Sequence, residues 1–194
     1  MPPDDKETDT MVRCDGTYAS LPLKKDTINI AIAQTRVNGV DGKNPAKDIK
    51  NNLDYMLECI DISQGYGGRS DLICFHEFPI VGFSNWSRED HYRIAIEVPG
   101  PETEEIGKKC QEYGCYIVFG TYAKDPDWPD HILHLMVLMG PDGNVIAKHW
   151  KQRNVRGLFP GSEQYTSAIY DVYDRFIEMY GQDAVIPVAK TDIG

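Results

Sequence analysis

The chain carries a short apolar run, Leu72-Ile73-Cys74-Phe75, followed within two residues by a carboxylate and within four by a proline. Glycines at 67 and 68 precede this run and Pro79 stops it, so the pattern predicts a short buried strand. Such a strand delivers Glu77 to its carboxyl end, the edge of an α/β sheet where active sites gather. Glu77 is therefore a candidate general base. The alternative is a carboxylate in a solvated loop after the strand.

The residues before this strand predict a β-α-β unit. Residues 28–34 alternate and are rich in β-branched side chains, which favours a first strand. From Pro45 to Gly65, apolar residues recur at the spacing of one helical face. These positions are Ile49, Leu53, Met56, Leu57 and Ile60. A strand, a helix and a second strand in this order favour parallel pairing of the two strands.

The second half of the chain predicts a mixed sheet. Acidic residues from Thr103 onward begin a helix that ends near Gly114. The turn at Pro141-Asp142-Gly143 predicts an antiparallel hairpin. Further strands are expected at residues 115–122, 132–139, 144–148 and 184–189, with a helix or a long excursion at 169–180.

The net charge excludes two classes of partner. The chain has 30 acidic and 20 basic side chains among 194 residues, a formal charge of -10, which repels phosphate backbones and anionic membrane surfaces. We therefore expect no nucleic acid and no membrane partner, and no window approaches the ~18 consecutive apolar residues of a membrane span. Residues 1–27 lack the apolar core of a signal peptide and are expected to be a flexible extension. Residues 28–194 are expected to form one domain.

The cysteines indicate reduced thiols in a cytoplasmic protein. They are odd in number and scattered, which does not fit a disulfide framework. The five are Cys14, Cys59, Cys74, Cys110 and Cys115. Cys110 and Cys115 are separated by four residues, but no histidine pair follows at the spacing of a zinc finger, so no metal site is expected.

A short basic segment follows the predicted hairpin in this otherwise acidic chain. It reads His149-Trp150-Lys151-Gln152-Arg153-Asn154. One interpretation is a set of solvated cations that balance nearby carboxylates, as in most short charge runs. The other is that Lys151 is directed at a negative charge that develops during a reaction.

The order of these features resembles the N-terminal portion of the nitrilase, or carbon-nitrogen hydrolase, superfamily. The resemblance covers residues 28–194 and rests on Phe75-His76-Glu77-Phe78-Pro79, on Lys148-His149-Trp150-Lys151 and on the segment 188–194. In the family the glutamate usually follows a proline, which His76 replaces here. The aromatic residue of the lysine motif stands one place later than in the family. The ordered set is more specific than any single motif.

The resemblance implies a four-layer αββα sandwich with mixed sheets and a Glu-Lys-Cys triad that hydrolyses a small amide. In such a triad a cysteine thiolate attacks the substrate carbon, the glutamate transfers protons and the lysine stabilises the oxyanion. By this resemblance Glu77 is the base and Lys151 the oxyanion partner. Glu163 is the nearest candidate for a second glutamate, and an alternative alignment places Arg156 there. The resemblance also implies a homo-oligomer, no metal or organic cofactor, and an aliphatic amide or formamide as substrate rather than a nitrile.

The nucleophile is the main departure from the family pattern. In the family the cysteine follows the strand that residues 188–194 resemble, and none of the five cysteines stands there. We therefore expect the sandwich to be incomplete in this chain and the chain alone to be inactive, with the cysteine on a missing C-terminal part or a separate chain. One alternative is a non-catalytic binding or scaffold subunit. Another is an unrelated α/β protein in which Glu77 and Lys151 are surface charges.

Overall fold

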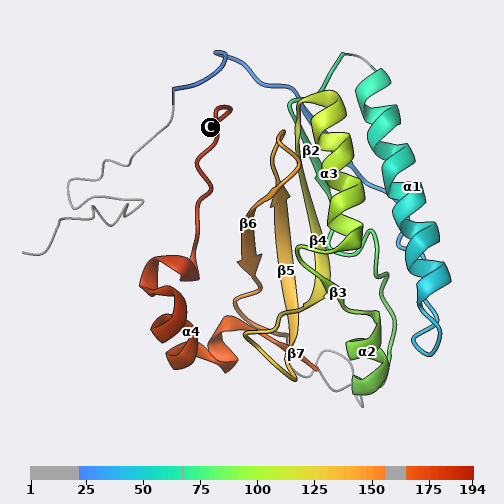
Figure 1. The fold of residues 1–194 in the computed structure, drawn as a ribbon, viewed down its shortest axis with the longest axis vertical. Helices are drawn as coiled ribbons and strands as arrows, with labels where there is room; N and C mark the ends of the chain where they lie inside the picture. Colours follow the sequence, from blue (N-terminus) through green and yellow to red (C-terminus); the bar gives the residue numbers. More distant parts are fainter. Residues whose placement is uncertain (1–21, 67, 156–164) are drawn as a thin grey trace, which may run out of the picture.

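A mixed β-sheet organises the part of the chain that the computed structural model describes, which is residues 22–66, 68–155 and 165–194. The strands are β1 (Ile30–Ala33), β2 (Leu72–Phe75), β3 (Ile96–Glu97), β4 (Tyr116–Lys124), β5 (Ile132–Met139), β6 (Val145–Trp150) and β7 (Thr166–Ser167). Their order is β1-β2-β4-β5-β6, with β3 beside β4 and β7 beside β5 (Figure 1). The pairs β1-β2 and β2-β4 are parallel, whereas β4-β5 and β5-β6 are antiparallel. The expected mixed α/β fold is confirmed.

Four helices accompany the sheet in the described residues. They are α1 (Ala46–Gly65), α2 (Arg88–Ile94), α3 (Pro101–Tyr113) and α4 (Tyr173–Tyr180), with short 3-10 turns η1 (Ile169–Asp171) and η2 (Gln182–Val185). In Figure 1, α1 and α3 run side by side along the sheet, and α4 lies beyond the edge strand β6. No helix in the described ranges combines the length and the apolar character that crossing a bilayer requires.

Local sequence signals explain the positions of the two long helices. Helix α1 follows Pro45 and ends at Gly65, as its apolar spacing predicts. Helix α3 begins at Pro101, two residues before the predicted start, because proline is well tolerated in the first helical turn. It ends at Tyr113 and is capped by Gly114, whose φ of 61° is the left-handed conformation that glycine adopts at low cost.

The two faces of the sheet differ in burial. Ile73 pairs with Ile117, and Phe119 with Val137, and all four side chains are fully buried. They belong to the same core cluster as the apolar residues of α1 and α3. The opposite face carries a row that crosses five strands, and none of its members is buried. This open row consists of Ile32, Cys74, Val118, Leu138 and Ala147.

The prediction of a strand at residues 184–189 is wrong. Residues 182–185 form η2, and no strand is assigned to residues 186–194. Ile186 and Val188 are each 64% exposed. Pro187 has no N–H to donate to a ladder, so the apolar composition of the segment is not sufficient to form a strand.

Residues 88–97 carry no predicted element and form α2 and β3 in the structure. Helix α2 has seven residues and buries only Ile94, so it shows no apolar periodicity. Its signal is the N-cap, where Ser87 accepts a hydrogen bond from the backbone N–H of Asp90 at 3.1 Å.

Candidate active site

The structure brings together two of the predicted site residues. Oε1 of Glu77 lies 3.2 Å from Nζ of Lys151, although the two residues are 74 positions apart in the sequence. Glu77 follows β2 and Lys151 follows β6 directly, so each side chain extends from the end of a strand. Glu163 and Arg156, the two candidates for the second site position, lie outside the described residues.

The backbone beside Glu77 is packed against β4. The N–H of Gly120 donates to the carbonyl of His76 at 3.1 Å, which extends the β2-β4 pairing past the end of β2. A Cβ atom at Gly120 would lie 2.4 Å from the carbonyl oxygen of Glu77 and 2.6 Å from its Cα. Only a glycine at this position leaves room for the Glu77 backbone.

Two backbone hydrogen bonds fix the start of the Lys151 side chain. The N–H of Lys151 donates to the carbonyl of His134 at 2.8 Å, and its carbonyl accepts from the N–H of Ile169 at 3.1 Å. The lysine backbone is therefore held by β5 on one side and by η1 on the other. The ammonium itself is on a flexible stem and is partly exposed.

His76 closes the turn that carries Glu77. Its Nδ1 accepts from the N–H of Phe78 at 3.1 Å, and its Nε2 lies 2.8 Å from Oγ1 of Thr35. Burial holds the pKa of His76 below its usual value, against an opposing effect of the Glu77 charge. A neutral ring with its proton on Nε2 satisfies both contacts. The side chain thus restrains the turn that carries Glu77.

A third partner of the site, His134, was missed by the sequence reasoning. Its Nε2 lies 2.9 Å from the same Oε1 atom of Glu77 that Lys151 contacts. His134 is the third residue of β5, is only 5% exposed and stacks on Phe78 with ring centroids 5.2 Å apart. The available signal was a single histidine inside the apolar run of residues 132–139, which more often indicates a core residue than a functional one.

The two basic partners keep Glu77 ionised. The hydrogen bond from His134 is the largest influence on the pKa of Glu77, which falls from 4.5 to about 2. Partial burial opposes this decrease, and the charges of His134 and Lys151 reinforce it. Because the side chain is still 48% exposed, solvent screens part of the attraction. At neutral pH the site holds a carboxylate.

A series of aromatic side chains in contact with one another connects the site with α2. Tyr122 on β4 lies next to His134, with centroids 5.1 Å apart, and meets His91 edge to face at 4.5 Å. His91 in turn contacts Trp86 at 5.2 Å. Neither ring nitrogen of His91 has a hydrogen-bond partner among the described residues. Burial, with a smaller effect from His134, lowers the pKa of His91 from 6.5 to about 4, so the ring is neutral near pH 7.

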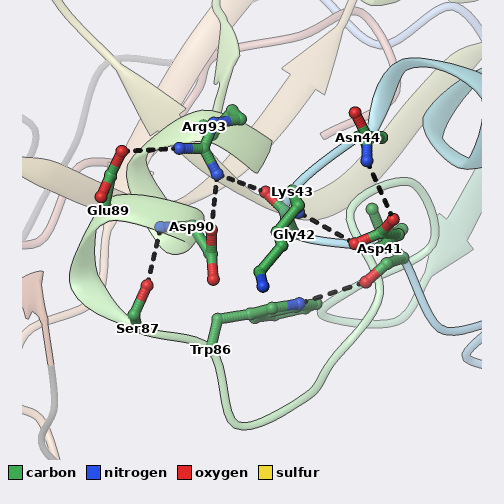
Figure 2. A network of polar contacts seen from close by, with 10 residues as sticks. Asp41, Gly42, Lys43, Asn44, Trp86, Ser87, Glu89, Asp90 and Arg93 are labelled. Atoms are coloured by element: carbon green, nitrogen blue, oxygen red, sulfur yellow. Dashed lines mark hydrogen bonds and ion pairs between the residues drawn. The ribbon is translucent and has the colours of Figure 1, made fainter.

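Figure 2 shows how α2 is held in place beside the loop that precedes α1. Arg93 donates to the carbonyl of Gly42 at 2.8 Å and also pairs with Asp90. Trp86 donates from Nε1 to the carbonyl of Val40 at 3.1 Å. A Cβ atom at Gly42 would lie 2.6 Å from the Trp86 ring, so this approach also requires a glycine. The network fixes Trp86, the aromatic neighbour of His91.

No described cysteine has the properties of an activated nucleophile. Burial raises the pKa of Cys59, Cys74, Cys110 and Cys115 above the usual range, so all four are protonated thiols near neutral pH. The hydrogen bonds of Glu77 and Lys151 involve no cysteine within the described ranges. The same residues contain no cluster of His, Cys, Asp or Glu that is arranged to hold a metal ion.

The family comparison identifies similarity along most of the chain. The model of the carbon-nitrogen hydrolase family matches residues 29–194. A formamidase from Bacillus cereus (strain B4264) is 31% identical over 107 residues, which are 54% of this chain and 31% of that protein. A formamidase from Bacillus thuringiensis (strain Al Hakam) is 29% identical over the same length and share. The matched region therefore spans about a third of the length of these curated relatives.

Solved structures share the fold at lower sequence identity. An N-terminal amidase with an Asn-Glu-Ala peptide superposes with a TM-score of 0.58 at 16% identity, covering 73% of this chain and 30% of that one. A CN-hydrolase superfamily protein from Xanthomonas campestris, with an arsenic adduct in its active site, superposes with a TM-score of 0.56 at 20% identity, covering 73% and 46%.

Proposed function

Because the chain belongs to the carbon-nitrogen hydrolase family, we propose that it contributes a base and an oxyanion partner to the hydrolysis of a small amide. Glu77 is the base and Lys151 is the oxyanion partner. The observation that carries the proposal is the 3.2 Å contact between these two side chains at the ends of two strands. The similarity to formamidases favours formamide or a short aliphatic amide as the substrate.

The carboxylate of Glu77 suits the proton-transfer steps of amide hydrolysis, and the ammonium of Lys151 suits the stabilisation of the oxyanion. A carboxylate beside a thiol accepts its proton and so raises the fraction of reactive thiolate, then returns the proton to the leaving amine. An ammonium a few ångströms away favours the negatively charged tetrahedral intermediate over the neutral amide. Both groups leave the same edge of the sheet, so both can reach one reacting carbon.

A cysteine outside the described residues completes this proposal. The four described thiols are protonated, and none contacts Glu77 or Lys151. We place the nucleophile after residue 194, where the resemblance to the family places it. The protein used in the test must therefore carry this cysteine, either on sequence after residue 194 or on a separate chain.

Hydrolysis of an amide panel tests the proposal. The panel contains formamide, acetamide, propionamide and the matching nitriles, and ammonia release is measured. Glu77→Gln keeps the shape of the side chain but removes the base, so kcat/KM should fall by at least ~10²-fold. Glu58→Gln on the exposed face of α1 is the matched control and should leave the rate unchanged. Near-normal turnover by the Glu77 variant would exclude Glu77 as the base, and a folded protein inactive on the whole panel would favour a binding or scaffold subunit.

A further inference from the structure

A buried histidine shares the carboxylate of Glu77 with Lys151. We propose that His134 is a positioning residue that holds Oε1 of Glu77, so that the other oxygen, Oε2, is the atom that exchanges protons during catalysis. The inference rests on the proposed function, because it assigns separate tasks to the two oxygens of the proposed base.

The contacts of the carboxylate are asymmetric. His134 Nε2 and Lys151 Nζ both reach Oε1, at 2.9 and 3.2 Å. Oε2 has no hydrogen-bond partner among the described residues. A carboxylate that accepts two charge-assisted bonds on one oxygen is fixed in rotation and leaves the lone pairs of the other oxygen available. The available oxygen is the one that a thiol proton can reach without breaking an existing bond.

His134 is better suited than Lys151 to hold the base throughout a reaction. Its ring is confined by stacking on Phe78 and by Tyr122, which is its pairing partner on β4. Lys151 has a flexible stem and is 34% exposed at the side chain. When the ammonium shifts toward a developing oxyanion, its bond to Glu77 weakens, but the bond from His134 remains. The histidine thus separates the orientation of the base from the stabilisation of the oxyanion.

The groups around the carboxylate define how its titration depends on His134. The charged or titratable neighbours are Lys151 after β6, His134 on β5, Tyr122 on β4 and His76 beside Glu77 itself. Burial raises the pKa of Tyr122 and lowers that of His76, so both are neutral near pH 7. Removing the His134 donor therefore leaves Lys151 as the described side chain that still contacts the carboxylate of Glu77, and the pKa of Glu77 should rise.

Two matched substitutions in the full-length protein test the role of the donor. His134→Phe keeps an aromatic ring against Phe78 but removes the N–H, whereas His134→Gln keeps an N–H donor at a similar reach. The carboxyl carbon of Glu77 is followed by NMR in protein labelled with ¹³C-glutamate, and Glu77→Gln assigns the signal. In parallel, the acid limb of kcat/KM is measured for the amide that is hydrolysed fastest.

The expected results separate positioning from simple packing. In His134→Phe the carboxyl titration and the acid limb should both move to higher pH by about one unit or more, with kcat reduced ~10-fold or more. In His134→Gln, which restores an N–H donor, both shifts should be clearly smaller than in His134→Phe. A folded His134→Phe protein with an unchanged carboxyl titration would overturn the inference. If the phenylalanine variant does not fold, His134→Leu is measured instead, and a Gln variant that titrates like the Leu variant also overturns it. Because the NMR titration needs no turnover, it gives a result even if no amide in the panel is hydrolysed.

Discussion

Two histidines near Glu77 differ in their hydrogen-bond partners and therefore in their electrostatic surroundings. His134 is buried with a carboxylate as its partner, so its N–H is used. His91 is packed between Trp86 and Tyr122, with both ring nitrogens unpartnered among the described residues. Protonating His91 places a desolvated charge among aromatic rings, which is unfavourable. The two residues should therefore respond differently to acid.

We predict that His91 makes the stability of the fold fall between about pH 6.5 and pH 4. The pKa of His91 is about 4 in the folded protein and near 6.5 when unfolded, so the unfolded chain binds more protons in this interval. The free energy of unfolding therefore decreases as the pH falls. His91→Phe preserves the edge-to-face packing and removes this titration, so urea denaturation at pH 7 and pH 5 should show a smaller loss in the variant than in wild type.

The control for this prediction is the interval from pH 7 to pH 8, where His91 is neutral in both states. The pKa of Glu77, about 2, adds a further loss of stability only below its ordinary value of 4.5, because its folded-state pKa is lowered rather than raised. Equal losses for wild type and His91→Phe between pH 7 and pH 5 would show that His91 does not cause the pH dependence.

The site residues differ in how readily the sequence predicts their roles. Glu77 and Lys151 each stand just after an apolar strand pattern, and strand ends are where functional side chains gather, so both were predictable. His134 was not, because its contact with Glu77 depends on the β4-β5 register that places it opposite Tyr122. Nothing in the local sequence encodes that register. His91 was hidden in the same way, inside a helix too short to give a periodic pattern.

The position of Glu77 depends on the packing between two elements, the turn after β2 and the strand β4. Gly120 is the contact point, because its missing side chain lets the Glu77 backbone approach β4. The carbonyl of His76 accepts from Gly120 in the same place. The turn and the strand are thereby locked together. Any atom inserted there must move the turn, since β4 is anchored in the centre of the sheet.

We predict that Gly120→Ala impairs the site more than it impairs the fold. The added methyl would overlap the Glu77 carbonyl at 2.4 Å, so the turn must shift and the carboxylate leaves its bond to His134. Overpacking of this kind should cost about 1–3 kcal/mol of unfolding free energy, and the amidase rate should fall ~10-fold or more because a misplaced base transfers protons poorly. Chemical denaturation and ammonia release measure the two effects.

Gly39→Ala is the matched control for this substitution. A Cβ atom at Gly39 has nothing within 4 Å, and its backbone is not in the left-handed region. The control should therefore keep both its stability and its rate. A Gly120→Ala protein with wild-type activity would show that Glu77 does not need its observed position.

Elements with a strong periodic or turn signal were predicted from the sequence, and the others were not. The β1-α1-β2 unit and the β5-β6 hairpin formed as expected, since their signals are local. The strand expected at 184–189 did not form, because residues 182–185 adopt the 3-10 turn η2 and Pro187 has no N–H to donate to a ladder. Composition alone therefore overestimates strands in this part of the chain.

The open row on the sheet is a property of the whole molecule. Its five positions are apolar, they align across β1, β2, β4, β5 and β6, and none is buried. Ile32 is 74% exposed at one end of the row. An apolar surface this continuous is characteristic of an interface. One sheet with α1 and α3 on its other face accounts for two layers of a four-layer αββα arrangement, so a second sheet is the natural cover.

We predict that sequence following residue 194 covers the open row. The matched region is only about a third of the length of the related formamidases, which leaves enough chain in proteins of that size for a second sheet. Ile32→Lys tests this by placing a charge in the row. In the 194-residue chain the new lysine stays in water, so the free energy of unfolding should change by less than about 0.5 kcal/mol. In the longer protein the charge would be buried without a partner, and the cost should reach several kcal/mol, on the order of 3 or more.

Ile62→Lys on α1 is the matched control, because Ile62 is 58% exposed on an element that packs against the opposite face of the sheet. It should be nearly neutral in both proteins. Light scattering distinguishes the other possible cover, a second copy of the chain, since Ile32→Lys would then convert a dimer of the 194-residue chain into a monomer. If Ile32→Lys is as mild as Ile62→Lys in the longer protein, the row is not covered by the following sequence. A cover of that kind would also close the Glu77 edge of the sheet, which excludes water from the carboxylate and strengthens its contacts with His134 and Lys151.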